Sequence, residues 1–81
     1  MIWKLYIVNC KDKSLYTGIT TDIVRRLKEH NSGKGAKSLL GKLPVKIVYT
    51  EQFDSQRDAM KREREIKSWK KEKKLKLISG L

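Results

Sequence analysis

The sequence has few of the residues that build disulfide-linked or zinc-linked folds. One cysteine, Cys10, and one histidine, His30, occur in 81 residues. A single cysteine excludes an internal disulfide, and one cysteine with one histidine cannot form a zinc site of the Cys and His type. Such cysteine usage is typical of a reducing compartment. The fold must therefore depend on the packing of apolar side chains.

Long hydrophobic runs are also absent. The apolar stretch from Ile2 to Val8 is far too short to span a bilayer, and it lacks the small-residue cleavage site of a signal peptide. The basic segments carry only short apolar stripes, without the sustained aromatic and leucine face of a membrane-surface helix. We therefore expect a cytoplasmic protein that does not bind membranes.

Negative charge is scarce. Nine acidic residues stand against twenty lysines and arginines, which gives a formal net charge of +11. So large a charge on so short a chain indicates a polyanionic partner, and nucleic acid is the first candidate. Since 81 residues leave no room for two hydrophobic cores, we expect residues 1–81 to form one domain.

Hydrophobic periodicity predicts the order strand, strand, helix, strand, helix, helix. The strands are expected at residues 2–9, 15–19 and 45–53, with turn residues between the first two that indicate a hairpin. The helices are expected at residues 22–31, 58–67 and 70–78. Ser55 and Asp58 resemble a capping box at the start of the second helix. The segment 32–44 holds three glycines, the only proline and three lysines, and is expected to be a long loop.

Ionisable residues interrupt the apolar faces of two predicted helices. Glu63 falls among Ala59, Met60 and Ile66, the apolar residues of its helix. A carboxylate that faces a core is usually neutralised, paired with a cation or bound to a metal. The ordinary explanation is an ion pair with Lys67 one helical turn away.

The first predicted helix shows the same pattern with basic groups. Its inward stripe, defined by Ile23 and Leu27, also passes through Arg26 and His30. Taken singly, Arg26 could extend its charged end to solvent and His30 could be a satisfied core imidazole. Together with Glu63 they favour a functional site, and we expect the two helices to direct these groups toward one interior.

The ordered set of motifs resembles the GIY-YIG nuclease domain. It comprises Lys4-Leu5-Tyr6, Tyr16-Thr17-Gly18, Arg26, His30, and Glu63 within Ala-Met-Lys-Arg-Glu. The resemblance extends from Trp3 to about Ile78. The stretch Gly-Lys-Gly-Ala-Lys at 33–37, followed by Pro-Val at 44–45, is similar to small stand-alone prokaryotic members. The first motif lacks the family's glycine and isoleucine, and the second has Thr17 for isoleucine, but both tyrosines and Gly18 are retained.

This resemblance implies an α/β (α+β) fold in which a small three-stranded antiparallel sheet is flanked by about three helices, with the active site on one sheet face. It also implies catalytic roles for five residues: Tyr6, Tyr16, Arg26, His30 and Glu63. Glu63 would hold one Mg²⁺ or Mn²⁺ ion, and Arg26 would donate to the phosphate oxygens. Either tyrosine would serve as the general base or orient the water, with His30 as a helper or the alternative base. The two tyrosines share a sheet face only if the hairpin pairs residues of equal parity.

Nucleic-acid contacts are expected from small and basic residues near these motifs. Gly18, inside a predicted strand, would let backbone and substrate approach closely, although a simple strand end explains it equally well. Phosphate contacts are expected from four cations: Arg25, Lys34, Lys37 and Lys42. Such contacts position a nucleic acid without reading its sequence.

The sequence therefore predicts a metal-dependent endonuclease that hydrolyses phosphodiester bonds in DNA, including branched or damaged forms, in repair or recombination. The alternative is a non-catalytic nucleic-acid-binding module on the same scaffold. A third reading is a small basic protein that docks on a larger nucleoprotein. DNA or RNA as substrate, a protein partner for targeting and the oligomeric state stay open at this point.

Overall fold

The computed structural model describes residues 1–80 and contains a three-stranded antiparallel sheet and three α-helices, as the sequence predicts. The strands are β1 (Trp3–Asn9), β2 (Leu15–Thr20) and β3 (Lys46–Phe53). The helices are α1 (Ile23–Asn31), α2 (Gln56–Lys67) and α3 (Lys71–Ser79), and a short 3₁₀ turn, η1 (Lys37–Leu39), lies in the long loop. None of the helices in residues 1–80 is long and apolar enough to cross a membrane.

β1 is the central strand, in the order β2-β1-β3. It is buried on both faces, because Leu5 and Ile7 point to one side and Tyr6 and Val8 to the other, all between 0% and 1% exposed. This explains why β1 lacks the alternation of polar and apolar residues that is expected of a strand with one solvent-exposed face. β2 and β3 form the two edges of the sheet.

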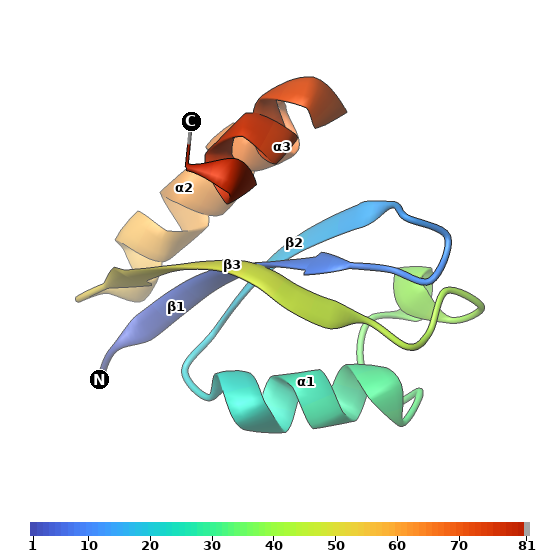
Figure 1. Ribbon diagram of the computed structural model, residues 1–81. Coiled ribbons are helices and arrows are strands. Elements are labelled where there is room, and N and C mark those ends of the chain that lie inside the picture. The colour runs from blue at the N-terminus through green and yellow to red at the C-terminus, as the bar shows by residue number, and fades with distance from the viewer. Residues whose placement is uncertain (81) are drawn as a thin grey trace.

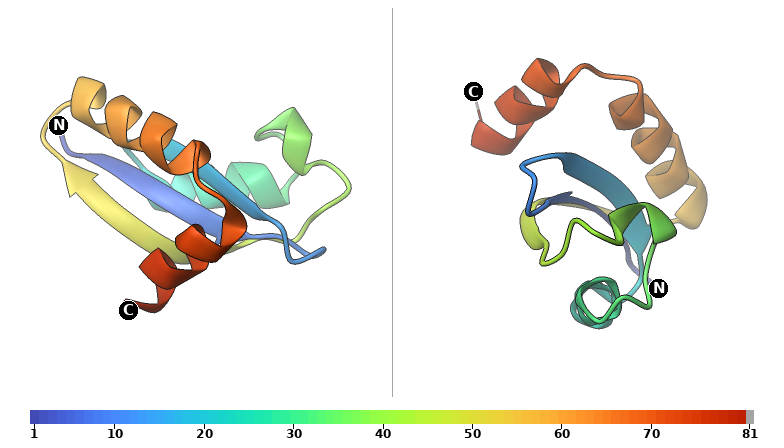
Figure 2. Two further views of the ribbon diagram at one scale, coloured as in Figure 1. Left: turned by 90° about the horizontal axis from the view of Figure 1, so that it is seen from above. Right: turned by 90° about the vertical axis from the view of Figure 1, so that its right-hand side faces the viewer.

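The helices cover opposite faces of this sheet (Figure 1). Ile23 and Leu27 of α1 pack on the face that carries Tyr6 and Val8. Ile66 of α2 packs on the other face, against Leu5 and Ile7. The two views of Figure 2 show α1 on one side of the sheet and α2 with α3 on the other. The expectation that α1 and α2 face one shared interior is therefore wrong, because the sheet lies between them. Ionisable groups of the two helices can approach each other only around an edge of the sheet.

Side-chain caps fix where α1 and α2 begin. The Asp22 carboxylate accepts a hydrogen bond from the Arg25 N–H at 3.0 Å, and the Ser55 hydroxyl accepts one from the Asp58 N–H at 3.2 Å. Each cap satisfies an N–H that has no partner within the first turn of its helix. The bond at Ser55 confirms the predicted helix start and the first half of the predicted capping box, in which the Ser55 hydroxyl accepts from the Asp58 N–H.

An ion-pair network orients α2 on β3. Arg62 donates to both carboxylate oxygens of Glu51, from Nε and from its second terminal nitrogen, at 3.0 Å each, and its guanidinium lies 5.2 Å from the Trp69 ring centre. Such two-point contacts fix direction as well as distance. Because Arg62 faces β3, Glu63, the next residue along α2, turns toward the opposite edge of the sheet, where β2 lies.

Candidate active site

The hairpin register places both candidate tyrosines on one face of the sheet. Tyr6 is paired with Gly18, and Val8 is paired with Tyr16. Directly paired residues of an antiparallel sheet point to the same side, as do residues two apart on one strand. The equal-parity condition is therefore met, and the two rings lie with their centres 6.4 Å apart.

His30, near the end of α1, lies against both tyrosines. Its ring centre is 5.9 Å from that of Tyr6 and 5.6 Å from that of Tyr16. His30 Nε2 and Tyr6 Oη are joined by a buried hydrogen bond of 2.8 Å, and both residues are only 1% exposed. Three side chains from a strand pair and a helix thus form one connected aromatic and imidazole cluster.

The long loop determines the tautomer of His30. The Ala36 N–H donates to His30 Nδ1 at 3.3 Å. Because Nδ1 accepts, the neutral imidazole carries its proton on Nε2 and donates it to Tyr6 Oη. Gly35 permits this close approach, since a Cβ there would lie 2.2 Å from His30 Nδ1 and 2.8 Å from His30 Cα. Sequence reasoning gave Gly35 and Ala36 no role in the site, because nothing local in their sequence indicates a contact with His30.

Burial shifts the titration of this cluster. It raises the pKa of the Tyr6 phenol, an effect that the nearby Arg26 guanidinium only partly offsets. Burial also lowers the pKa of the His30 imidazole, and the positive charge of Arg26 acts in the same direction. At neutral pH, Tyr6 is therefore a protonated phenol and His30 a neutral imidazole.

The lowered pKa of His30 predicts a loss of stability in mild acid. The unfolded chain takes up a proton near the ordinary value of 6.5, whereas the folded chain does so only at lower pH. The free energy of unfolding should therefore fall as pH drops from about 7 to about 5. Urea denaturation of wild type and His30→Gln across this range measures the effect. Since the chain has no other histidine, equal pH dependence in both proteins would contradict the prediction.

Gly18 makes room for Tyr6. A Cβ at Gly18 would lie 2.5 Å from Tyr6 Oη and 2.7 Å from Tyr6 Cζ, closer than side-chain atoms ever come. The Tyr6 phenol occupies the space next to this glycine, and this contact is a sufficient reason for glycine here. Close approach of a substrate at Gly18 stays a prediction. The glycine sits inside β2 and not at a simple strand end.

Arg26 lies at the edge of the cluster. Its side chain is 33% exposed and donates to the Glu29 carboxylate at 3.2 Å on the same helix. It is close enough to Tyr6 for its charge to oppose the rise in the Tyr6 pKa. An arginine that is partly exposed and only weakly paired can turn its planar guanidinium toward an incoming phosphate.

Glu63 reaches the same region from α2. Its side chain is 22% exposed and forms an ion pair with Lys67 at 3.4 Å, so the ordinary explanation of this residue also holds. The Lys67 ammonium lies 5.8 Å from the centre of the Tyr16 ring, which places the pair beside the aromatic cluster. The charge of Glu63 also contributes to the raised pKa of Tyr6. Lys67 was not among the predicted site residues.

The donor set around Glu63 restricts which ion could bind. Residues 1–80 contain no group of three or more His, Cys, Asp or Glu side chains placed to hold a metal. One carboxylate fits a hard cation such as Mg²⁺, which keeps several of its waters and takes other oxygen ligands from a bound phosphate. The site does not suit an ion that needs a full set of protein ligands.

The predicted phosphate-binding cations are arranged differently from one another. Arg25, Lys34 and Lys37 are exposed on α1 and the long loop. Lys42 is half-buried, and its ammonium faces Asp12 at 4.0 Å. Its backbone oxygen also accepts from the Lys11 N–H at 2.8 Å, so Lys42 belongs to the contact between the long loop and the β1–β2 turn.

Comparison with known proteins places these features in a family. The chain is 55% identical to a UPF0213 protein of Staphylococcus saprophyticus over 75 residues, which cover 93% of this chain and 92% of the relative. It is 55% identical to a UPF0213 protein of Haloquadratum walsbyi over 73 residues, or 90% and 82% of the two chains.

Solved structures agree with the fold. The solution structure of a UPF0213 protein from Bacillus halodurans matches 98% of this chain and 84% of that chain with a TM-score of 0.63 and 48% identity. That of an E. faecalis protein matches 98% and 85% with a TM-score of 0.65 and 40% identity. The family described as the GIY-YIG catalytic domain matches residues 2–76. Because this match covers nearly the whole chain and relatives about half identical to it align over most of their length, the chain belongs to the GIY-YIG family.

Proposed function

We propose that this protein is a metal-dependent endonuclease that hydrolyses phosphodiester bonds in DNA. The observation that supports it most directly is the cluster of Tyr6, Tyr16 and His30, with Arg26 at its edge and Glu63 beside it. A surface that only binds nucleic acid does not need a buried tyrosine–histidine pair. A purely structural core does not need an arginine and a carboxylate next to such a pair. Membership of the GIY-YIG family supports a nuclease-type reaction on nucleic acid.

Arg26 and Glu63 have complementary roles in this proposal. The Glu63 carboxylate would hold one Mg²⁺ or Mn²⁺ ion, which when bound supplies charge stabilisation at the phosphate and at the leaving oxygen. The Arg26 guanidinium would donate to the non-bridging phosphate oxygens as negative charge builds on them. Lys67, which neutralises Glu63 in the free protein, would turn toward the substrate once that carboxylate binds a cation.

The two tyrosines are given different tasks. Tyr6 is buried with a raised pKa, and its oxygen accepts a hydrogen bond from His30 Nε2–H. Its phenol therefore stays protonated, and its own O–H is the donor that it can offer. Tyr16 is half-buried and has the Lys67 ammonium over its ring. We assign Tyr16 to orient or deprotonate the water, and Tyr6 with His30 to hold the neighbouring ring and donate to the phosphate.

Phenylalanine variants separate these tasks. Tyr16→Phe is expected to slow single-turnover cleavage by about 10²–10⁴-fold, the usual contribution of general acid–base catalysis. Tyr6→Phe is expected to slow cleavage less and to lower stability by about 1 kcal/mol, because His30 Nε2 loses its acceptor. Single-turnover rates and urea denaturation measure both effects. A larger loss of rate in Tyr6→Phe would reverse the assignment.

The test of the proposed function is cleavage of labelled duplex, single-stranded, flap and four-way-junction DNA with Mg²⁺, with Mn²⁺ and with EDTA. Cleavage that needs the divalent cation supports the endonuclease, and the preferred DNA form indicates whether the task is repair or recombination. Binding of every DNA without cleavage would favour a non-catalytic nucleic-acid-binding module. Cleavage in intact cells that the isolated protein does not show would indicate a protein partner that delivers the enzyme to its target.

A further inference from the structure

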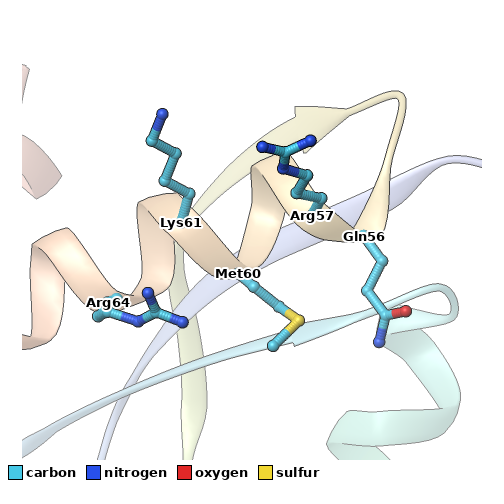
Figure 3. A pocket seen from close by; sticks show the side chains of 5 residues that line it. All are labelled: Gln56, Arg57, Met60, Lys61 and Arg64. Atoms are coloured by element: carbon cyan, nitrogen blue, oxygen red, sulfur yellow. The ribbon is translucent and has the colours of Figure 1, made fainter.

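A basic groove lies on the outer side of α2 and plays no part in the site described above. It has a volume of about 480 Å³ and is lined by five residues: Gln56, Arg57, Met60, Lys61 and Arg64. Three of the five are cations and none is acidic. Figure 3 shows Gln56 and Met60 pointing toward the strand beside the helix, while Lys61 points away from it.

The groove begins next to Glu63. In an α-helix, residues three and four apart are neighbours on the surface. Met60 therefore lies one turn before Glu63, and Arg64 follows it on the side away from the core. The helix thus presents, in order around its axis, the buried Ala59 and Ile66, then Glu63, then the groove residues.

The charge of the groove is uncompensated. The ion pairs of residues 1–80 use other cations, namely Arg26, Lys42, Arg62 and Lys67. On the same helix, Glu65 pairs with Arg62 and Glu63 pairs with Lys67, so neither of these carboxylates is paired with a cation of the groove. A concave surface with three positive charges attracts an extended anion.

Met60 gives the groove an apolar centre. Its side chain is 41% exposed, although the sequence pattern places it among the inward residues of the helix. A thioether between cations suits a ligand that alternates charge with apolar groups. A nucleic-acid strand has this character, because its phosphates are separated by sugars and bases.

We propose that Arg57, Lys61 and Arg64 bind phosphates of the nucleic-acid strand on one side of the cleaved bond, with Met60 against a sugar or base. This inference rests on the proposed function for the position of the cleaved bond at Glu63 and Tyr16. It assigns the path of the strand across α2. The exposed Arg25, Lys34 and Lys37 lie on α1 and the long loop, on the other side of the sheet.

Matched charge removal tests the proposal. One variant carries Arg57→Gln, Lys61→Gln and Arg64→Gln, and its control carries Lys70→Gln, Lys73→Gln and Lys76→Gln around α3, where an acid, Glu72, accompanies the lysines. Both variants lose three charges, so long-range attraction to a polyanion changes equally. Glutamine is a good helix former, and circular dichroism with thermal melting confirms that both variants are folded.

Binding of a labelled DNA duplex and single strand is measured by fluorescence anisotropy in EDTA over a range of salt concentrations. Each phosphate contact adds about 0.9 to the slope of log affinity against log salt for a duplex. We expect the slope to fall by about two to three in the α2 variant and by less than about one in the α3 variant. Equal slopes in the two variants would overturn the proposal.

Two further measurements make the outcome specific. Met60→Ala is expected to weaken binding of the single strand several-fold without changing the salt slope, because no ion is released by an apolar contact. Polyglutamate of equal charge should compete poorly, and competition as strong as that of DNA would overturn the nucleic-acid assignment. Because binding is measured without a divalent cation, loss of binding in the α2 variant supports the groove even if no DNA is cleaved. If the wild-type protein cleaves DNA and the α2 variant binds DNA as tightly as the wild type, the proposed role of the groove is wrong. The proposed nuclease activity is then still supported.

Discussion

Cleavage is expected to fall by at least about 10²–10³-fold in Glu63→Gln, the effect of removing a group that stabilises charge in the transition state. The amide keeps the size of the side chain but loses the negative charge that would hold a divalent cation. Because the ion pair between Glu63 and Lys67 is partly exposed and worth only a few tenths of a kcal/mol, the variant should stay folded. Cleavage rates with Mg²⁺ and with Mn²⁺ provide the measurement.

Two controls make this result specific. Glu72→Gln removes the same charge from an exposed carboxylate on α3 and should leave the cleavage rate unchanged. DNA binding in EDTA should be equal or slightly tighter in Glu63→Gln, because the substitution removes a negative charge from a basic surface. Full activity in Glu63→Gln, or cleavage that continues in EDTA, would exclude the proposed role of this residue.

Gly35→Ala is expected to disrupt the site from outside it. The added methyl would lie 2.2 Å from His30 Nδ1 and 2.8 Å from its Cα, so the loop or the imidazole must move. The hydrogen bond from the Ala36 N–H to Nδ1 would break, and His30 would lose its fixed tautomer and its bond to Tyr6 Oη. We expect a loss of about 1–3 kcal/mol in stability, and about 10²-fold in cleavage if a catalytic ring moves by about 1 Å.

Nitrogen NMR reports this change directly. Since His30 is the only histidine, its two ring nitrogens give an isolated set of signals. The wild-type protein should carry the proton on Nε2 at neutral pH, and Gly35→Ala should show a mixture of tautomers. A proton on Nδ1 in the wild-type protein would disprove the arrangement that we derive from Ala36.

Gly41→Ala is the matched control for this variant. Gly41 has a φ of +86°, and a Cβ there would meet nothing within 4 Å. Alanine in that conformation costs about 1–2 kcal/mol through the backbone alone. The control should therefore lose stability and still keep the His30 tautomer and the cleavage rate, which separates general destabilisation from a specific effect on the site.

Local patterns in the sequence predicted where the strands and helices lie, but they predicted poorly which way individual side chains point. The six strands and helices occur where periodicity places them, within a few residues, because alternation and helical spacing are properties of short segments. Met60 shows the limit of such patterns. The helix packs through Ala59 and Ile66, so Met60, about 100° further round the axis from Ala59, is exposed.

By itself, the sequence determined which chemical groups this protein has, in what order and on which elements, and its net charge of +11 indicated a polyanionic partner. Only the tertiary structure decided that Tyr6 pairs with Gly18, that Ala36 fixes the tautomer of His30, and that α1 and α2 lie on opposite faces of the sheet. These features depend on contacts between residues far apart in the chain. Such contacts follow from strand register and from how the faces of the sheet are covered, and no local pattern specifies either.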